Sequence, residues 1–168
     1  MPNAVTHVII AIVLIDLFRK YVLKKKNFPL YLILIGGIAG LLPDIDILIY
    51  WILQTFTTIN ISEVHRIFTH TFFIPLIFLL LALAIWKFWP KISHVLFVLS
   101  AGWTTHILLD VIFTSRMQVF YPISLQSYGL GLIPMEFLSG TFYLGLDAII
   151  LILWLVYEYH ARNLKDYI

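Results

Sequence analysis

Long apolar runs take up most of this chain and restrict how it can fold. Five of them approach the length that crosses a bilayer, about 17–25 residues, at residues 4–23, 28–42, 71–89, 93–113 and 141–157. The chain is 61% hydrophobic and 12% charged, whereas soluble domains are about 45–50% apolar and about 25% charged. We therefore predict an all-α polytopic membrane helix bundle with about five transmembrane helices, built as one integral-membrane domain over residues 1–168.

A shorter apolar stretch at 45–56 has too few residues for a full span and predicts an interfacial or re-entrant segment. The N-terminal run lacks the basic start and small-residue cleavage site of a signal peptide, so we expect it to be retained. The net charge of +2 does not favour a nucleic-acid partner. The absence of cysteine excludes disulfides and thiolate metal ligands.

Basic residues indicate how such a bundle would be oriented. With five spans and an outside N-terminus, nine of the eleven basic residues fall on one side, leaving only Arg66 and Arg116 on the other. The nine are Arg19, Lys20, Lys24, Lys25, Lys26, Lys87, Lys91, Arg162 and Lys165. The positive-inside rule assigns that side to the cytoplasm. We expect a multi-pass protein of the plasma (inner) membrane, with its N-terminus outside and its C-terminus cytoplasmic.

Potential metal ligands gather at the opposite, extracytoplasmic face of this arrangement. Eight histidines and aspartates lie at the outer ends of the predicted spans: His7, Asp44, Asp46, His65, His70, His106, Asp110 and Asp147. Nothing in the hydropathy requires them to share a side. His106 and Asp110 are four residues apart, so a helix presents both on one face. His65 and His70 are five apart, so either their segment begins as a loop or they approach from different sides.

The aspartate pair in "LLPDID" (41–46) is hard to explain without a cation. No Lys or Arg lies within fifteen residues of Asp44 or Asp46, and a carboxylate at hydrocarbon depth costs about 2.5–3.5 kcal/mol on the most lenient scale. A divalent ion removes this cost and the repulsion between the acids. Mixed imidazole and carboxylate ligands suit zinc best here, with manganese and iron as alternatives, and we expect one or two ions.

Simpler explanations exist for single residues. A lone histidine such as His7 often only hydrogen-bonds a neighbouring helix, and Asp44 could cap a short helix. Asp16, His94 and His160 fall near the other face and are expected to be interfacial. These explanations do not account for the gathering of the remaining histidines and aspartates at one face of the membrane.

Four motifs resemble the membrane-bound, metal-dependent hydrolase family, also described as YdjM-like or LexA-binding inner-membrane proteins. They are "TH" at 6–7, "LLPDID" at 41–46, "HRIFTHT" at 65–71 and "THILLD" at 105–110, with a later match in "VFYPIS" at 119–124. Thr71 stands where the family usually has serine. The ligand order is also similar, more weakly, to the zinc phospholipase C and P1-nuclease group, but the further histidine motif of that group is missing.

These features together predict a metal-dependent hydrolase at the extracytoplasmic face, acting on a phosphoester of a lipid or lipid-linked substrate. We expect Asp44, Arg66 and Thr69 to be catalytic, with Arg66 as the phosphate clamp and Asp44 as general base. Residues 124–140 have the composition of a loop or lid, and Asp147 or Glu136 could add a ligand. Two rival functions are a small cation or proton transporter and a non-catalytic membrane anchor for a protein partner that the sequence does not identify.

Overall fold

A computed structural model describes residues 4–24, 28–113, 116–132 and 140–160, with side chains omitted for 140–148 and 158. All regular secondary structure in the described part is helical, apart from one isolated bridge between Met117 and Tyr128, which confirms the all-α prediction. The helices are α1 (Ala4–Tyr21), α2 (Tyr31–Ala39), α3 (Ile45–Leu53), α4 (Phe73–Ile85), α5 (Pro90–Phe113) and α6 (Gly140–His160), with short 3-10 turns η1 (Leu42–Asp44) and η2 (Ile61–Glu63).

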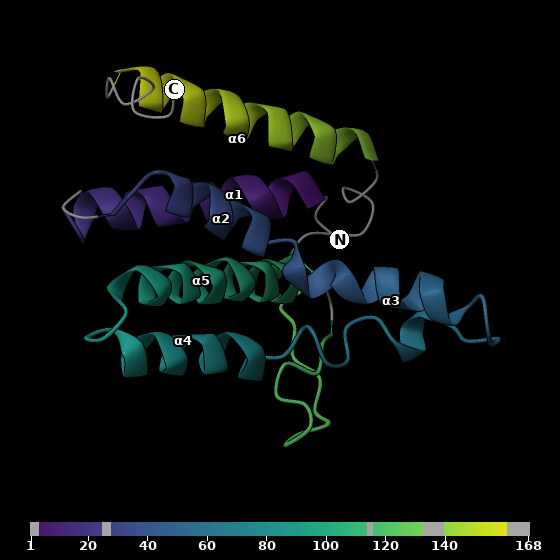
Figure 1. Cartoon of the computed structure of the whole chain (residues 1–168). Coiled ribbons are helices and arrows are strands. Elements are labelled where there is room, and N and C mark those ends of the chain that lie inside the picture. The colour runs from purple at the N-terminus through teal and green to yellow at the C-terminus, as the bar shows by residue number, and fades with distance from the viewer. Residues whose placement is uncertain (1–3, 25–27, 114–115, 133–139, 161–168) are drawn as a thin grey trace.

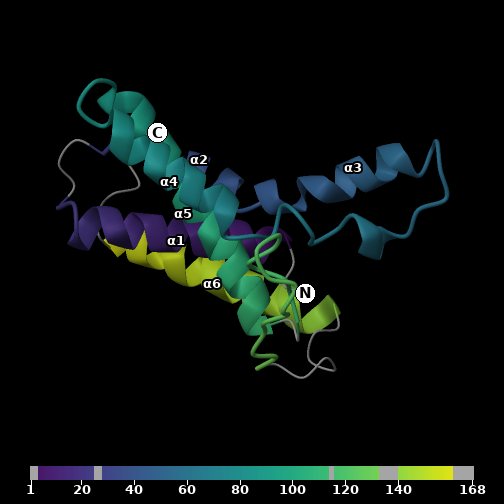
Figure 2. The ribbon, with the colours of Figure 1, turned by 90° about the horizontal axis from the view of Figure 1, so that it is seen from below.

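Helix α5 is the centre of the bundle. It packs against α1, α2 and α4, while α6 lies along α1 on the other side (Figure 1). Seen from below, α3 projects away from the other helices and the chain returns through an irregular segment to α4 (Figure 2). One end of the bundle therefore brings together the start of α1, the α2–α3 junction, the segment before α4 and the second half of α5.

A glycine on α5 sets how closely this helix approaches α2. A Cβ atom at Gly102 would overlap the carbonyl oxygen of Gly36 and lie only 2.8 Å from the Cβ atom of Ala39. Small residues let two helix backbones come this close in a membrane protein. Because His106 lies one helical turn beyond Gly102, the close contact also determines where the His106 ring sits.

The prediction of five spanning helices is wrong for the described part of the chain. Among the helices as far as they are described, only α5 is both long and apolar enough to cross a bilayer; the number rises to two if α2 and the Leu42–Leu53 segment, bent by 41°, are counted as one span. The predicted run at 93–113 is thus confirmed as a candidate span. The predicted interfacial or re-entrant segment at 45–56 corresponds to α3, the second arm of that bent pair.

The shortfall has physical causes. The nine residues of α2 and thirteen of α4 span only about 14 and about 20 Å at about 1.5 Å per residue, against about 30 Å of hydrocarbon. Helix α1 carries three charged residues in its last turns, where Asp16 pairs with Arg19 at 3.1 Å and Lys20 at 2.7 Å. The side chains of residues 140–148 and 158 of α6 are not described.

Helix α3 buries a charged side chain and exposes its apolar ones, the opposite of a helix in a water-soluble protein. Its only buried residue is Asp46, whereas Leu48, Ile49, Trp51 and Ile52 are exposed. Water would penalise this arrangement, while lipid favours apolar side chains outside and polar groups inside. The inversion therefore supports contact between α3 and a membrane.

Replacing Gly102 with alanine tests the close approach of α5 and α2. We expect Gly102→Ala to lower the thermal unfolding midpoint in detergent, because overpacking costs about 1–3 kcal/mol and a backbone carbonyl cannot move aside. Gly36→Ala is the control, since the close contact of its Cβ is with the terminal methyl of Ile15, a side-chain end that can rotate, and its contact with Val98 is at an ordinary 3.5 Å. Equal midpoints for the two variants would contradict this account.

Candidate metal centre

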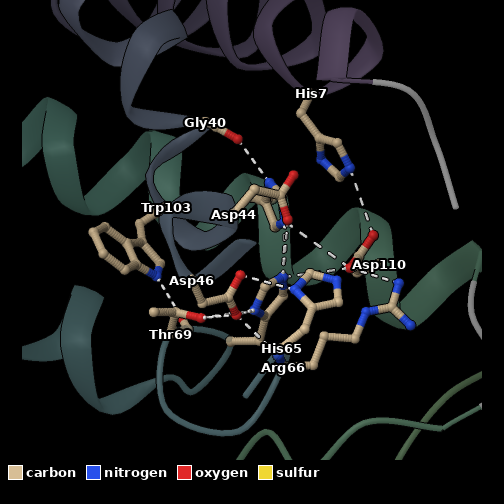
Figure 3. Close-up of polar contacts among 11 residues, drawn as sticks. His7, Gly40, Asp44, Asp46, His65, Arg66, Thr69, Trp103 and Asp110 are labelled. Atoms are coloured by element: carbon tan, nitrogen blue, oxygen red, sulfur yellow. Dashed lines mark hydrogen bonds and ion pairs between the residues drawn. The ribbon is translucent and has the colours of Figure 1, made fainter. Parts of the chain in front are cut away.

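Histidine and aspartate side chains from four parts of the chain converge at one end of the bundle (Figure 3). His7 comes from α1, Asp44 from η1, His70 from the segment before α4, and His106 and Asp110 from α5. The side chains of His70, His106 and Asp110 have no exposed surface, His7 is 1% exposed and Asp44 is 22% exposed. So many buried ionisable groups require either one another or a bound ion.

The His106 ring is oriented by a backbone carbonyl. Its Nδ1 lies 2.7 Å from the oxygen of Gly40, and a carbonyl can only accept, so Nδ1 carries the proton and donates it. Nε2 is then the lone-pair atom of a neutral ring, and it faces the interior of the cluster. This is the arrangement in which protein histidines bind metals, with the second nitrogen held by a hydrogen bond.

His70 is oriented in the same way by a hydroxyl group. Thr69 donates its hydroxyl proton to Asp46 Oδ2 at 2.6 Å, and its Oγ1 lies 3.0 Å from His70 Nδ1. With its one proton committed to a carboxylate, Thr69 must accept from Nδ1–H of His70. In the neutral ring, Nε2 of His70 is therefore also a lone-pair atom. The indole N–H of Trp103 donates to the Thr69 carbonyl at 2.7 Å and fixes this segment to α5.

The two Nε2 atoms face each other with two carboxylates beside them. They are 3.2 Å apart. Asp44 Oδ1 lies 3.4 Å from His70 Nε2 and 3.6 Å from His106 Nε2, and Asp110 Oδ2 lies 3.8 and 3.9 Å from the same atoms. Ligand atoms around a tetrahedral zinc are separated by about 3.4 Å, because each bond is about 2.0–2.1 Å. Asp44, His70 and His106 can therefore hold one divalent ion, and Asp110 lies beside them.

Orphaned polar atoms support this fit. Asp44 Oδ1 and Asp110 Oδ1 are buried and have no hydrogen-bond partner among the described residues. Buried polar atoms are normally satisfied, so each such exception needs an explanation. A cation bound within the cluster would satisfy Asp44 Oδ1 directly.

Asp46 has a different environment from Asp44. It accepts hydrogen bonds from the backbone N–H of Arg66 at 2.9 Å and from Thr69, and His65 Nδ1 lies 2.8 Å from its other oxygen. These partners saturate the carboxylate, so Asp46 orients the His70 segment. Asp46, His65 and His70 also form a group that could hold an ion, but only after these hydrogen bonds are given up.

His7 lies at the edge of the cluster. Its ring stacks on His106 at 3.8 Å between centroids, and its Nε2 is 3.5 Å from Asp110 Oδ1. Neither ring nitrogen has a hydrogen-bond partner among the described residues. His7, His106 and Asp110 form a third possible ligand group, in which Asp110 could bridge two ions through its two oxygens.

Arg66 borders the cluster and has an unusual backbone. Its Nη2 atom is 3.4 Å from Asp110 Oδ2, and its φ angle is 70°. This left-handed conformation is disfavoured for arginine and commonly marks functional sites. The Asp46 hydrogen bond to its N–H holds the strained turn.

Protonation of His70 competes with metal binding. Burial disfavours the charged ring, but the neighbouring carboxylates of Asp44 and Asp46 outweigh this effect and raise the pKa of His70 above its usual 6.5. A proton on Nε2 of His70 would occupy the position that a cation would take, so protonation of this ring opposes metal binding.

Seven of the eight predicted ligands lie at this end of the bundle, in the three groups described above. Glu136 lies outside the described residues, and the side chain of Asp147 is not described. His65 and His70 are both in irregular structure, and they contact Asp46 from different sides. Sequence reasoning missed Gly40, Gly102 and Trp103. A small residue one turn before His106 was a usable signal for Gly102, but a backbone carbonyl such as that of Gly40 has no sequence signature.

Metal content provides the direct test of this cluster. We expect detergent-purified protein, prepared without chelator, to contain at least one zinc, manganese or iron ion per chain by elemental analysis. The His106→Ala, Asp110→Ala double variant should lose most of it. His94→Gln, at the other end of α5, removes an imidazole outside the cluster and should keep it. Folded, metal-free wild type would mean that a shared proton alone holds the cluster together.

Comparison with known proteins identifies a family. The sequence model of the YdjM inner membrane protein family matches residues 1–164. No curated protein and no solved structure matches the chain significantly. The family match covers nearly all of the sequence, including every motif that carries the resemblance noted above. The chain therefore belongs to the YdjM inner membrane protein family.

Proposed function

We propose that this protein is a metal-dependent hydrolase that cleaves a phosphoester of a lipid or lipid-linked substrate. The observation that carries the proposal is the pair of Nε2 atoms of His70 and His106, 3.2 Å apart, each made a lone-pair atom by its own Nδ1 partner. Two lone pairs at this distance repel each other unless a proton or a metal ion lies between them. Zinc suits the imidazole and carboxylate ligands best.

The reaction follows from the positions of the side chains. A bound divalent cation supplies acidified water and neutralises charge on the phosphoryl oxygens. Asp44 is more exposed than the other carboxylates of the site, at 22% against 4% for Asp46 and 0% for Asp110. Its second oxygen can accept a proton from attacking water. Asp46 and Thr69 hold the His70 ring, and Arg66 offers a guanidinium to the phosphoryl group.

A lipid substrate fits the surface beside the cluster. Helix α3 begins directly after Asp44 and exposes Leu48, Ile49, Trp51 and Ile52. An apolar chain lying against this surface would bring its polar headgroup to the ligands. Soluble phosphoesters would gain nothing from it.

The charge distribution supports an extracytoplasmic site. Arg19 and Lys20 end α1 and Lys91 begins α5, both at the end of the bundle opposite the metal cluster (Figure 1). The positive-inside rule favours the cytoplasm for this basic end. The ligands then face the extracytoplasmic side of the inner membrane.

Hydrolysis of defined lipids tests the proposed activity. Purified protein in mixed micelles should release phosphate or a phosphorylated headgroup from at least one lipid of a panel of phospholipids and prenyl phosphates. Chelator should abolish release and zinc should restore it. The His106→Ala, Asp110→Ala variant is the inactive control. Metal-loaded protein that cleaves no member of the panel would contradict the proposal.

Arg66→Ala separates substrate binding from metal binding. Charge-assisted hydrogen bonds contribute about 1.5–3 kcal/mol, so we expect KM to rise about tenfold or more while metal content stays unchanged. The variant keeps the same backbone strain because alanine also disfavours φ of 70°. Arg66→Lys retains the charge without the planar fork, so its KM should lie between those of wild type and Arg66→Ala. Loss of metal with unchanged KM would make Arg66 structural.

A further inference from the structure

A polar cavity adjoins the metal cluster, and of the residues that line it the mechanism above uses Arg66 alone. It has a volume of about 460 Å³ and lies between the segment 61–67 and the loop after α5. Its polar lining comprises Ser62, His65, Arg66, Arg116, Gln118 and Ser127. Small-molecule sites in proteins have volumes of about 300–1,000 Å³, so the cavity can hold more than a single ion.

The cavity has the charge of an anion site. Two arginines line it, and no carboxylate is among the described residues that do so. The nearby Glu63 is held by Asn60 at 3.0 Å. Hydroxyl and amide groups from Ser62, Gln118 and Ser127 add neutral hydrogen-bond donors. Guanidinium groups match phosphate oxygens in pairs, which makes phosphate the anion that this lining suits best.

Arg66 connects the cavity to the metal cluster. Its Nη2 atom is 3.4 Å from Asp110 Oδ2, yet the same residue lines the cavity. The several N–H groups of this one guanidinium can therefore reach an anion at the cluster and a second anion in the cavity. Two phosphates joined by a bridging oxygen are the simplest substrate that presents two adjacent anions to one guanidinium.

We propose that this cavity binds a second phosphate group, so that the substrate is a lipid diphosphate rather than a phosphomonoester. The inference rests on the proposed metal-dependent hydrolysis of a lipid-linked phosphate, and it changes the bond that is cleaved from a phosphoester to the phosphoanhydride of a lipid diphosphate. Hydrolysis adds the hydroxyl of water to the phosphorus at the cluster and breaks the bond from that phosphorus to the bridging oxygen. The bridging oxygen leaves with the phosphate in the cavity, and the second proton of water passes to the products. Arg116 is then a specificity residue.

Binding of a non-hydrolysable probe tests this inference. We would measure the dissociation constants of methylenediphosphonate and inorganic phosphate for zinc-loaded protein in detergent. Wild type should bind the diphosphonate about tenfold or more tightly than phosphate. Arg116→Gln should remove most of that preference with unchanged zinc content and unchanged phosphate affinity. Lys91→Gln, which removes an exposed cation at the far end of α5, should behave as wild type.

The outcomes separate the possible explanations. A preference that survives in Arg116→Gln reflects chelation by zinc and overturns the inference, as does equal affinity for both probes in wild type. A dodecyl ester of the diphosphonate that binds more tightly than the free compound supports a lipid diphosphate; equal affinity overturns the lipid part. If wild type holds no zinc, the proposed function fails, whereas Arg116-dependent diphosphonate binding to that protein would still support the anion site.

Discussion

The candidate site depends on two imidazole nitrogens that face each other across 3.2 Å. A flip of either ring would separate the two nitrogens, but hydrogen bonds at Nδ1 prevent it. The Gly40 carbonyl holds the His106 ring, and the Thr69 hydroxyl holds the His70 ring. The positions of Gly40 and Thr69 depend in turn on the packing of α5. This helix approaches α2 at Gly102, and its Trp103 donates a hydrogen bond to the Thr69 carbonyl. One central helix therefore supplies two ligands and also positions the partners that orient the rings.

The aspartates in "DID" show how helical geometry divides two similar residues between two tasks. Residues two apart on a helix point about 200° from each other, because each residue turns the chain by about 100°. Asp44 ends η1 and faces the cluster, whereas Asp46 lies in the first turn of α3 and faces the irregular segment before α4. One carboxylate can thus bind an ion while the other organises the loop that carries His65, Arg66 and Thr69.

Hydropathy and helical spacing predicted the parts of this protein that depend on side-chain type. The all-α class, the α5 span and the gathering of histidines and aspartates all followed from such patterns. The number of spans did not, because apolar composition shows neither that α2 ends after nine residues nor that Asp16, Arg19 and Lys20 pair within α1. The separate task of Asp46 was also missed. Its partners include the backbone N–H of Arg66, and no sequence pattern reports a backbone group or a positive φ angle.

Charge balance indicates how many ions the cluster can hold. The site holds three carboxylates, Asp44, Asp46 and Asp110, and one guanidinium, that of Arg66, which contacts Asp110. With neutral imidazoles the site therefore lacks two positive charges. A proton on His70 supplies one of them, and a divalent ion supplies both. A second divalent ion at His7 would leave an excess of two positive charges in a buried region, which is costly. An anionic substrate would remove that excess, so the second position is expected to fill only together with a phosphate group.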